Sequence, residues 1–280
     1  MPQYTPKFHI GDPGPQDLYE YLDTVEARDP SSNEELLSAA SDLGHNLGTY
    51  EKTTAGAVLG RLGVVNPDDQ FEFTELGDSL VDVMYRDKKV FNNLLHFLYY
   101  TAYERYPEEY IFSSYTYRAF TNYLYNNAPF ETVQGHKGTI VSEVATQAES
   151  DNLELSYTQS GVSVSTKSFN NYFQYLDSLS PSINSNREGS SGFELRSFCP
   201  PELFVIVVDY LYQQNNSEYN TLLQVTEETK QRLRQICLLS ESGFGEVLDF
   251  ADQAYPFFSK KHDFGLNLRL EREVGFDDIQ

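Results

Sequence analysis

The 280-residue sequence predicts a mainly α-helical protein, in which helix-turn-helix units that carry short β-hairpins surround one long apolar helix. Three observations lead to this fold class. Between residues 32 and 85, two helical patterns are followed by a strand-like pair and a further helix. Residues 90–106 are apolar on nearly every helical face, as expected of a helix buried on all sides. Residues 198–272 repeat the order of helices followed by a hairpin.

The first unit opens with a helix whose start is marked by a capping box. Ser32 followed by Glu35 has the required spacing, and apolar residues then recur at helical intervals as far as Leu43. Glycines mark the turn to a second helix, which ends at Gly63. Short strands at 64–65 and 71–73 and a helix that begins after Thr74 complete the order of a winged helix.

A winged helix binds DNA by inserting the second helix of the turn into the major groove, with the hairpin against the backbone. Hydroxyls and basic groups on that helix suit phosphate contacts. The candidate DNA-binding residues of this unit are Thr49, Lys52, Thr53, Thr54 and Arg61. The hairpin turn, however, carries Asp68 and Asp69 and no basic residue, so packing or protein contacts are an equally weighted use of this unit.

The second unit, at 198–272, has a different charge pattern. Seven of the 20 basic residues fall within the last 51 positions, which is the local enrichment expected of a nucleic-acid face. Five of them are candidate DNA-binding residues: Lys230, Arg234, Lys260, Lys261 and Arg269. The alternative is that these cations pair with Glu227, Glu228, Glu271 and Glu273 on a solvated surface.

Composition divides the chain into three units. We expect an N-terminal winged-helix domain at 1–90, a central helical domain at 91–180 and a C-terminal winged-helix-like domain at 193–280. The segment 181–192 is rich in Ser, Asn and Gly, which is typical of a linker.

The net charge of −22 conflicts with DNA binding under ordinary ionic conditions. Acidic residues outnumber basic ones 42 to 20 and are spread along the whole chain, which indicates adaptation to molar intracellular salt in a halophilic organism. The Debye length there is about 3 Å, so carboxylate repulsion is screened. Phosphate attraction also contributes little in such salt, and binding would depend on shape and base contacts.

Residues with catalytic or metal-binding spacing are not found in the sequence. The five histidines show no ligand pattern, and His96, on the apolar helix, is expected to be a hydrogen-bonded core residue. Cys199 and Cys237 are too few and too distant in sequence for a zinc site. We therefore assign no catalytic residue, metal or cofactor, except Mg²⁺ if the chain nicks DNA.

We expect a cytoplasmic protein with reduced thiols and no membrane association. The first 22 residues lack the apolar core of a secretory signal, and no apolar run approaches the roughly 18 residues that span a bilayer.

Several short motifs resemble, in order and spacing, a family of proteins of unknown function from DNA phosphorothioation and phage-defence gene clusters. They cover residues 45–270 and comprise Thr74-Glu75-Leu76-Gly77, Leu94-Leu95-His96, Pro200-Pro201-Glu202-Leu203-Phe204, Leu238-Leu239-Ser240-Glu241 and Gly265-Leu266. The resemblance implies a DNA-acting component of an Ssp-type single-strand phosphorothioation system, whose partners are a cysteine desulfurase, an ATPase and a sulfur-transfer enzyme. It also implies DNA nicking, although no nickase motif maps onto this chain.

The sequence thus predicts a protein that binds double-stranded DNA within a modification or restriction system for antiviral defence, as its nicking or target-recognition part. Other proteins of the same system are the expected partners. Two alternatives remain open: a winged-helix transcriptional regulator and a non-catalytic scaffold for protein interactions.

Overall fold

The computed structural model describes residues 13–105, 112–130, 136–150, 168–187 and 190–279, and within them it is mainly helical. Eleven helices and five short strands lie in these segments. The four N-terminal helices are α1 (Pro15–Arg28), α2 (Asn33–Asp42), α3 (Thr49–Arg61) and α4 (Glu75–Arg86). The next four are α5 (Lys88–Arg105), α6 (Phe112–Asn127), α7 (Lys137–Ser150) and α8 (Ser168–Asp177). The weak alternation of residues 153–164 is compatible with a small hairpin, and this segment lies outside the described residues.

The C-terminal part follows a small hairpin of β1 (Asn184–Arg187) and β2 (Ser190–Phe193). Its helices are α9 (Pro201–Gln214), α10 (Glu227–Cys237) and α11 (Glu241–Ala254). Its strands are β3 (Leu223–Gln224), β4 (Phe258–Lys261) and β5 (Asn267–Leu270), which form an antiparallel sheet in the order β3-β5-β4. The tail hairpin predicted from the sequence is therefore present, and β3 adds a strand that was not expected.

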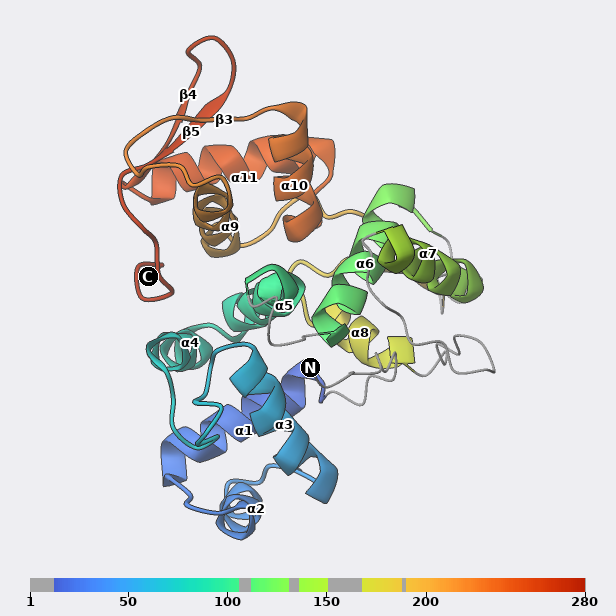
Figure 1. Ribbon diagram of the computed structural model, residues 1–280, viewed down its shortest axis with the longest axis vertical. Helices are drawn as coiled ribbons and strands as arrows, with labels where there is room; N and C mark the ends of the chain where they lie inside the picture. The colour runs from blue at the N-terminus through green and yellow to red at the C-terminus, as the bar shows by residue number, and fades with distance from the viewer. Residues whose placement is uncertain (1–12, 106–111, 131–135, 151–167, 188–189, 280) are drawn as a thin grey trace.

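Helix α5 lies between the N-terminal helices and the C-terminal unit (Figure 1). It contacts α4, α6, α8, α9 and α10, and nearly all of its residues from Val90 to Ala102 are buried. A helix that is apolar on all sides requires neighbours on all sides, so the burial of α5 agrees with its sequence.

His96, halfway along α5, joins three helices. Its Nε2 donates to the Ile236 carbonyl at 2.8 Å, so its Nδ1 accepts from the Tyr117 hydroxyl at 2.6 Å. Burial lowers the pKa of this imidazole to about 3. A neutral ring with both nitrogens bonded is the core histidine that the sequence predicts.

Tyrosine rings fill the space between α5, α6 and α8. The centroids of Tyr99 and Tyr175 are 5.0 Å apart, and those of Tyr99 and Tyr117 are 5.1 Å apart. Aromatic packing of this kind supplies large buried area with defined geometry.

The N-terminal hairpin is weaker than predicted. Ser32 caps α2 by accepting from the Glu35 amide at 3.2 Å, as its motif indicates. The expected strands at 64–65 and 71–73, however, reduce to a single bridge between Val65 and Phe73. Pro67 lacks an amide donor, and side chains take part in bonding the rest of the turn, so the strand ladder does not extend.

The segment 181–192, expected as a linker, contains β1 and most of β2. Ile183 and Phe193 are both buried at the open end of this hairpin, opposite its turn, and Phe193 also exchanges two backbone hydrogen bonds with Phe130. Polar residues can form such a hairpin because its ladder uses backbone groups alone.

Residues 274–279 contact both α9 in the C-terminal part and α4 in the N-terminal part of the chain. Asp209 of α9 accepts from the Val274 amide at 3.1 Å, and Arg86 of α4 donates to the Ile279 carbonyl at 2.5 Å. Burial, with the nearby charges of Glu273 and Asp278, raises the pKa of Asp209 to about 6, although the bond from Val274 opposes this shift.

We expect Asp209 to make stability depend on pH. Because its pKa is higher in the folded state, its contribution is greatest in acid and is lost as the pH rises from about 4 to about 6, by about 2 kcal/mol. Chemical denaturation of the wild type and Asp209→Asn at a series of pH values checks this. The difference between their unfolding free energies should change across that window, and a constant difference would contradict the assignment.

Candidate nucleic-acid interface

Helix α3 packs on α1 and α2 and leaves one side open to solvent. Its buried residues are Ala55, Val58, Leu59 and Leu62. Of the predicted DNA-binding residues, Arg61 is exposed and Thr54 is half-buried. Thr49, Lys52 and Thr53 lie in the first half of the helix, and their side chains are outside the described set.

The charge of α3 differs from that of its neighbours. It carries Lys52 and Arg61 against Glu51, whereas α1, α2 and α4 each contain more acidic than basic residues. Within the described N-terminal helices, α3 therefore offers the most favourable surface for a polyanion.

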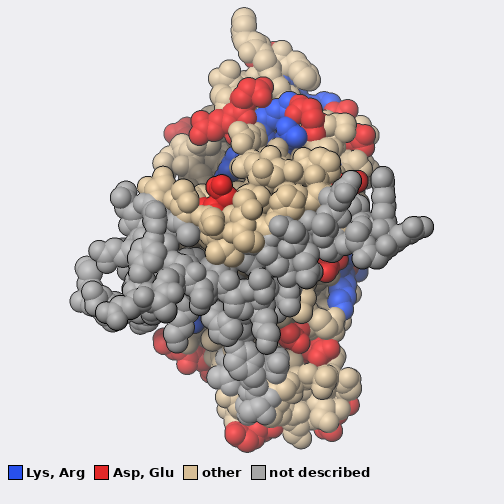
Figure 2. Space-filling model, turned by 90° about the vertical axis from the view of Figure 1, so that its right-hand side faces the viewer, with Lys and Arg blue, Asp and Glu red and all other residues tan. Residues whose placement is uncertain are grey.

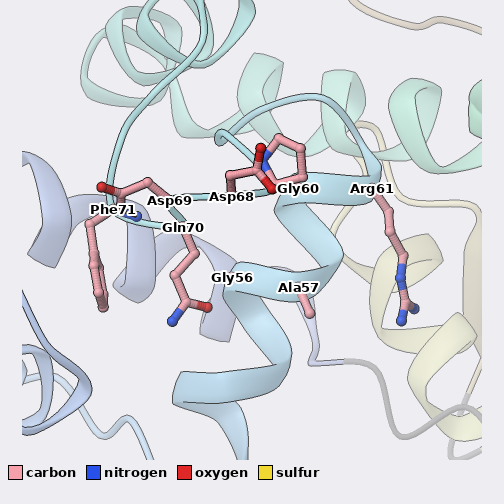
Figure 3. Close-up of a pocket in the computed structure, with 9 residues that line it drawn as sticks. Gly56, Ala57, Gly60, Arg61, Asp68, Asp69, Gln70 and Phe71 are labelled. Atoms are coloured by element: carbon pink, nitrogen blue, oxygen red, sulfur yellow. Dashed lines mark hydrogen bonds between the residues drawn. The ribbon is translucent and has the colours of Figure 1, made fainter. Parts of the chain in front are cut away.

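A surface pocket of about 460 Å³ lies between α3 and the turn that follows it (Figure 3). Gly56, Gly60 and Arg61 line it from the helix, and Asp68 and Gln70 are among the residues that line it from the turn. The Arg61 side chain extends away from the turn residues in this view. The pocket thus combines a small-residue helix surface with an acidic opposite wall.

Side-chain bonds shape this turn. Asn66 Oδ1 accepts from the Asp68 amide at 3.0 Å, and Asp69 Oδ1 accepts from the Phe71 amide at 3.1 Å. The Tyr21 hydroxyl donates to the Gln70 carbonyl at 3.0 Å and ties the turn to α1. Asp68 and Asp69 remain exposed, so the turn presents negative charge where a DNA backbone would approach a wing.

Two of the predicted C-terminal cations share one carboxylate. Lys230 pairs with Glu241, and Arg234 Nη1 donates to the same carboxylate at 2.5 Å. The Arg234 guanidinium also lies 5.6 Å from the centre of the Tyr125 ring. These two residues are therefore paired with a carboxylate, but the partner is Glu241 of α11 and not one of the glutamates expected from the sequence.

The other three predicted cations lie on or beside the hairpin. Lys260 pairs with Asp249 of α11, while Arg269 bonds the side-chain oxygen of Asn220 and lies 4.0 Å from a Glu271 oxygen. Lys261 is exposed and forms no ion pair within the described part of the chain. Figure 2 shows basic side chains bordered by acidic ones over this end of the molecule, at its top.

The two remaining basic residues of this region also have partners. Arg232 points toward α5, where it pairs with Glu104, and Arg272 pairs with Asp278 at 2.6 Å. Local sequence enrichment could not identify Glu104 as the partner of Arg232, because the two residues are 128 positions apart.

Helix α11 presents an acidic outer side next to these ion pairs. Its exposed residues include Glu241, Glu246, Asp249 and the aromatic Phe250. Such a surface opposes a DNA backbone and is compatible with a protein partner.

Within the described residues, no group of three or more His, Cys, Asp or Glu side chains is placed to hold a metal ion. None of the described helices has the length and apolar character needed to cross a membrane.

Comparison with known proteins gives no match: no family model, curated protein or solved structure is similar to this chain.

Alanine substitutions at two glycines of the N-terminal unit should change the free energy of unfolding differently. A Cβ at Gly77 would lie 2.0 Å from the Val64 carbonyl oxygen, whereas a Cβ at Gly60 would make only ordinary contacts. We expect Gly77→Ala to destabilise the protein by about 2–3 kcal/mol through overpacking. Gly60→Ala should be neutral or stabilise it by up to about 1 kcal/mol through helix propensity. Chemical denaturation at constant salt measures both, and equal effects would show that the Gly77 contact is unimportant.

Proposed function

We propose that the chain binds double-stranded DNA through α3. The observation that carries this proposal is the position and charge of α3: it packs on α1 and α2, exposes Arg61, and has a basic excess in an otherwise acidic unit. A helix presented in this way is the reading element of a helix-turn-helix.

The order of elements supports winged-helix units at both ends. In the C-terminal unit, the order α9-β3-α10-α11-β4-β5 with β5 in the middle of the sheet is compatible with a winged helix and supports this interpretation. The N-terminal unit has three helices before its turn, with a single bridge in place of a strand pair. We interpret both as winged-helix units, of which the first is the candidate for DNA.

The biological setting follows from the motif resemblance alone. We propose that DNA binding serves a phosphorothioation-linked modification or restriction system against foreign DNA, with target recognition as the role of this chain. Nicking remains a hypothesis for which no catalytic residue is assigned.

A scaffold for protein interactions is the second candidate, and a specific observation favours it. Lys230, Arg234 and Lys260 are paired with carboxylates, and α11 beside them is acidic. The C-terminal unit therefore suits a protein partner better than a phosphate backbone. The two candidates are compatible if the N-terminal unit binds DNA and the C-terminal unit binds the rest of the system.

Fluorescence anisotropy with labelled duplexes tests DNA binding. Measurements in KCl from about 0.5 to about 3 M cover the range in which counterion release fades. We expect Lys52→Gln combined with Arg61→Gln to weaken binding about tenfold or more, because each lost contact costs about 1 kcal/mol or more.

Lys260→Gln combined with Lys261→Gln is the matched control, because it removes the same charge from the C-terminal hairpin. We expect this control to keep wild-type affinity. If the hairpin variant loses affinity and the α3 variant keeps it, the DNA contact lies on the C-terminal hairpin. If the wild type binds no duplex at any salt concentration, only the scaffold function remains.

The same preparation separates the alternative activities. Tight binding to one palindrome would favour a transcriptional regulator. Magnesium-dependent relaxation of supercoiled plasmid would favour a nickase.

A further inference from the structure

The turn between β4 and β5 presents an aromatic side chain to solvent. Phe264 is fully exposed, whereas the other large apolar side chains of the described residues are at most 53% exposed. The hairpin that carries it projects from the C-terminal end of the molecule, at the top of Figure 1. A phenylalanine in this position buries none of its ring within its own chain, so it has a large apolar area to bury against a partner.

The conformation of this turn is fixed from within the protein. Phe264 has a φ of 56°, in the left-handed region that bulky side chains seldom adopt. Asn267 is buried, and its Nδ2 donates to the carbonyls of Asp263 at 2.8 Å and Gly265 at 3.2 Å, one on each side of Phe264. The ring is therefore held outward on an ordered turn, which loses little conformational entropy when it docks.

The pocket beside α3 can receive such a ring. Its volume of about 460 Å³ lies within the range of pockets that hold a ligand. On the helix side it is lined by Gly56, Ala57 and Gly60, whose side chains are too small to fill it (Figure 3). On the opposite side, Pro67 and Phe71 add apolar surface. An aromatic side chain could therefore lie directly against the helix.

The charges around the pocket and around the hairpin turn are complementary. Asp68 and Asp69 line the pocket, are exposed, and take part in none of the ion pairs of the described residues. On the hairpin, Lys261 is exposed and is likewise absent from those ion pairs. Arg61 at the pocket and Asp263 on the turn supply a second pair of opposite charges. Such an arrangement favours one orientation of docking.

We propose that the β4–β5 turn of one copy of this chain docks in the α3 pocket of a second copy, with Phe264 against the helix and Lys261 beside Asp68. The turn and the pocket lie at opposite ends of the molecule, so a chain cannot fill its own pocket (Figure 1). Each docked copy keeps a free turn or a free pocket. The contact is therefore head-to-tail and builds rings or open chains of molecules.

A contact made by one turn is small, so the association is weak and depends on protein concentration. Sedimentation velocity of the full-length protein without DNA, from about 10 μM to about 1 mM, covers the expected range. In about 1 M KCl the Debye length is about 3 Å, which screens repulsion between acidic copies but leaves charges in direct contact. The average sedimentation coefficient should rise with concentration. A monomer over the whole range would overturn the proposal.

Substitution of the exposed ring tests the role of the turn. Phe264→Asn removes the ring, and asparagine tolerates the left-handed conformation, so the turn should keep its shape. We expect association to weaken at least about tenfold. Phe250→Asn is the matched control, because Phe250 is a 52% exposed phenylalanine on α11, outside the hairpin. The control should associate like the wild type. If Phe250→Asn weakens association and Phe264→Asn does not, α11 is the interface and the proposal is wrong.

An exchange of charges tests whether the turn docks in this pocket. Lys261→Asp and Asp68→Lys change exposed side chains, so both variants should fold, but each should associate more weakly than the wild type. An equimolar mixture of the two should regain association, because opposite charges then face each other again. If the mixture stays monomeric, the turn does not dock in this pocket and the proposal fails. Since DNA is absent throughout, that result would leave the proposed DNA binding unaffected.

Discussion

The burial of helix α5 is the constraint on which the other elements depend. With apolar residues on every side, this helix is stable in water only if other elements cover its whole circumference. Helix α4 covers it from the N-terminal unit, α6 and α8 from the central part, and α9 and α10 from the C-terminal unit. The hydrogen bonds of His96 to α6 and α10 then fix the rotation of α5 about its axis, since only one orientation satisfies both ring nitrogens.

Several cations of this acidic chain join one helix to another. Glu104 of α5 bonds Arg118 of α6, Arg232 of α10 and Tyr210 of α9, so one carboxylate connects four helices. Glu241 joins Lys230 and Arg234 in a similar way. A basic cluster in the sequence of such a protein therefore indicates internal ion pairs as readily as a nucleic-acid face.

The helices were predictable because caps and periodicity are local signals. Ser32 and Thr74 each cap the helix that the sequence places after them, and the tail hairpin forms where the sequence predicts it. The pairing of β3 with β5 was not predictable, because two residues carry no recognisable period. The candidate site divides in the same way: the place of Arg61 on α3 could be predicted from the local sequence, whereas the pairing of Arg232 with Glu104 joins residues 128 positions apart.

The contact of Arg86 with the Ile279 carbonyl has a consequence for synthesis on the ribosome. The two residues are 193 positions apart, so α4 leaves the ribosome long before its partner segment exists. At about 5–20 residues per second, the N-terminal unit waits on the order of ten seconds or more before residues 274–279 can dock. During that interval the exposed side of α4 and the uncovered α5 are open to aggregation or to chaperones, until residues 274–279 complete the enclosure of the N-terminal unit.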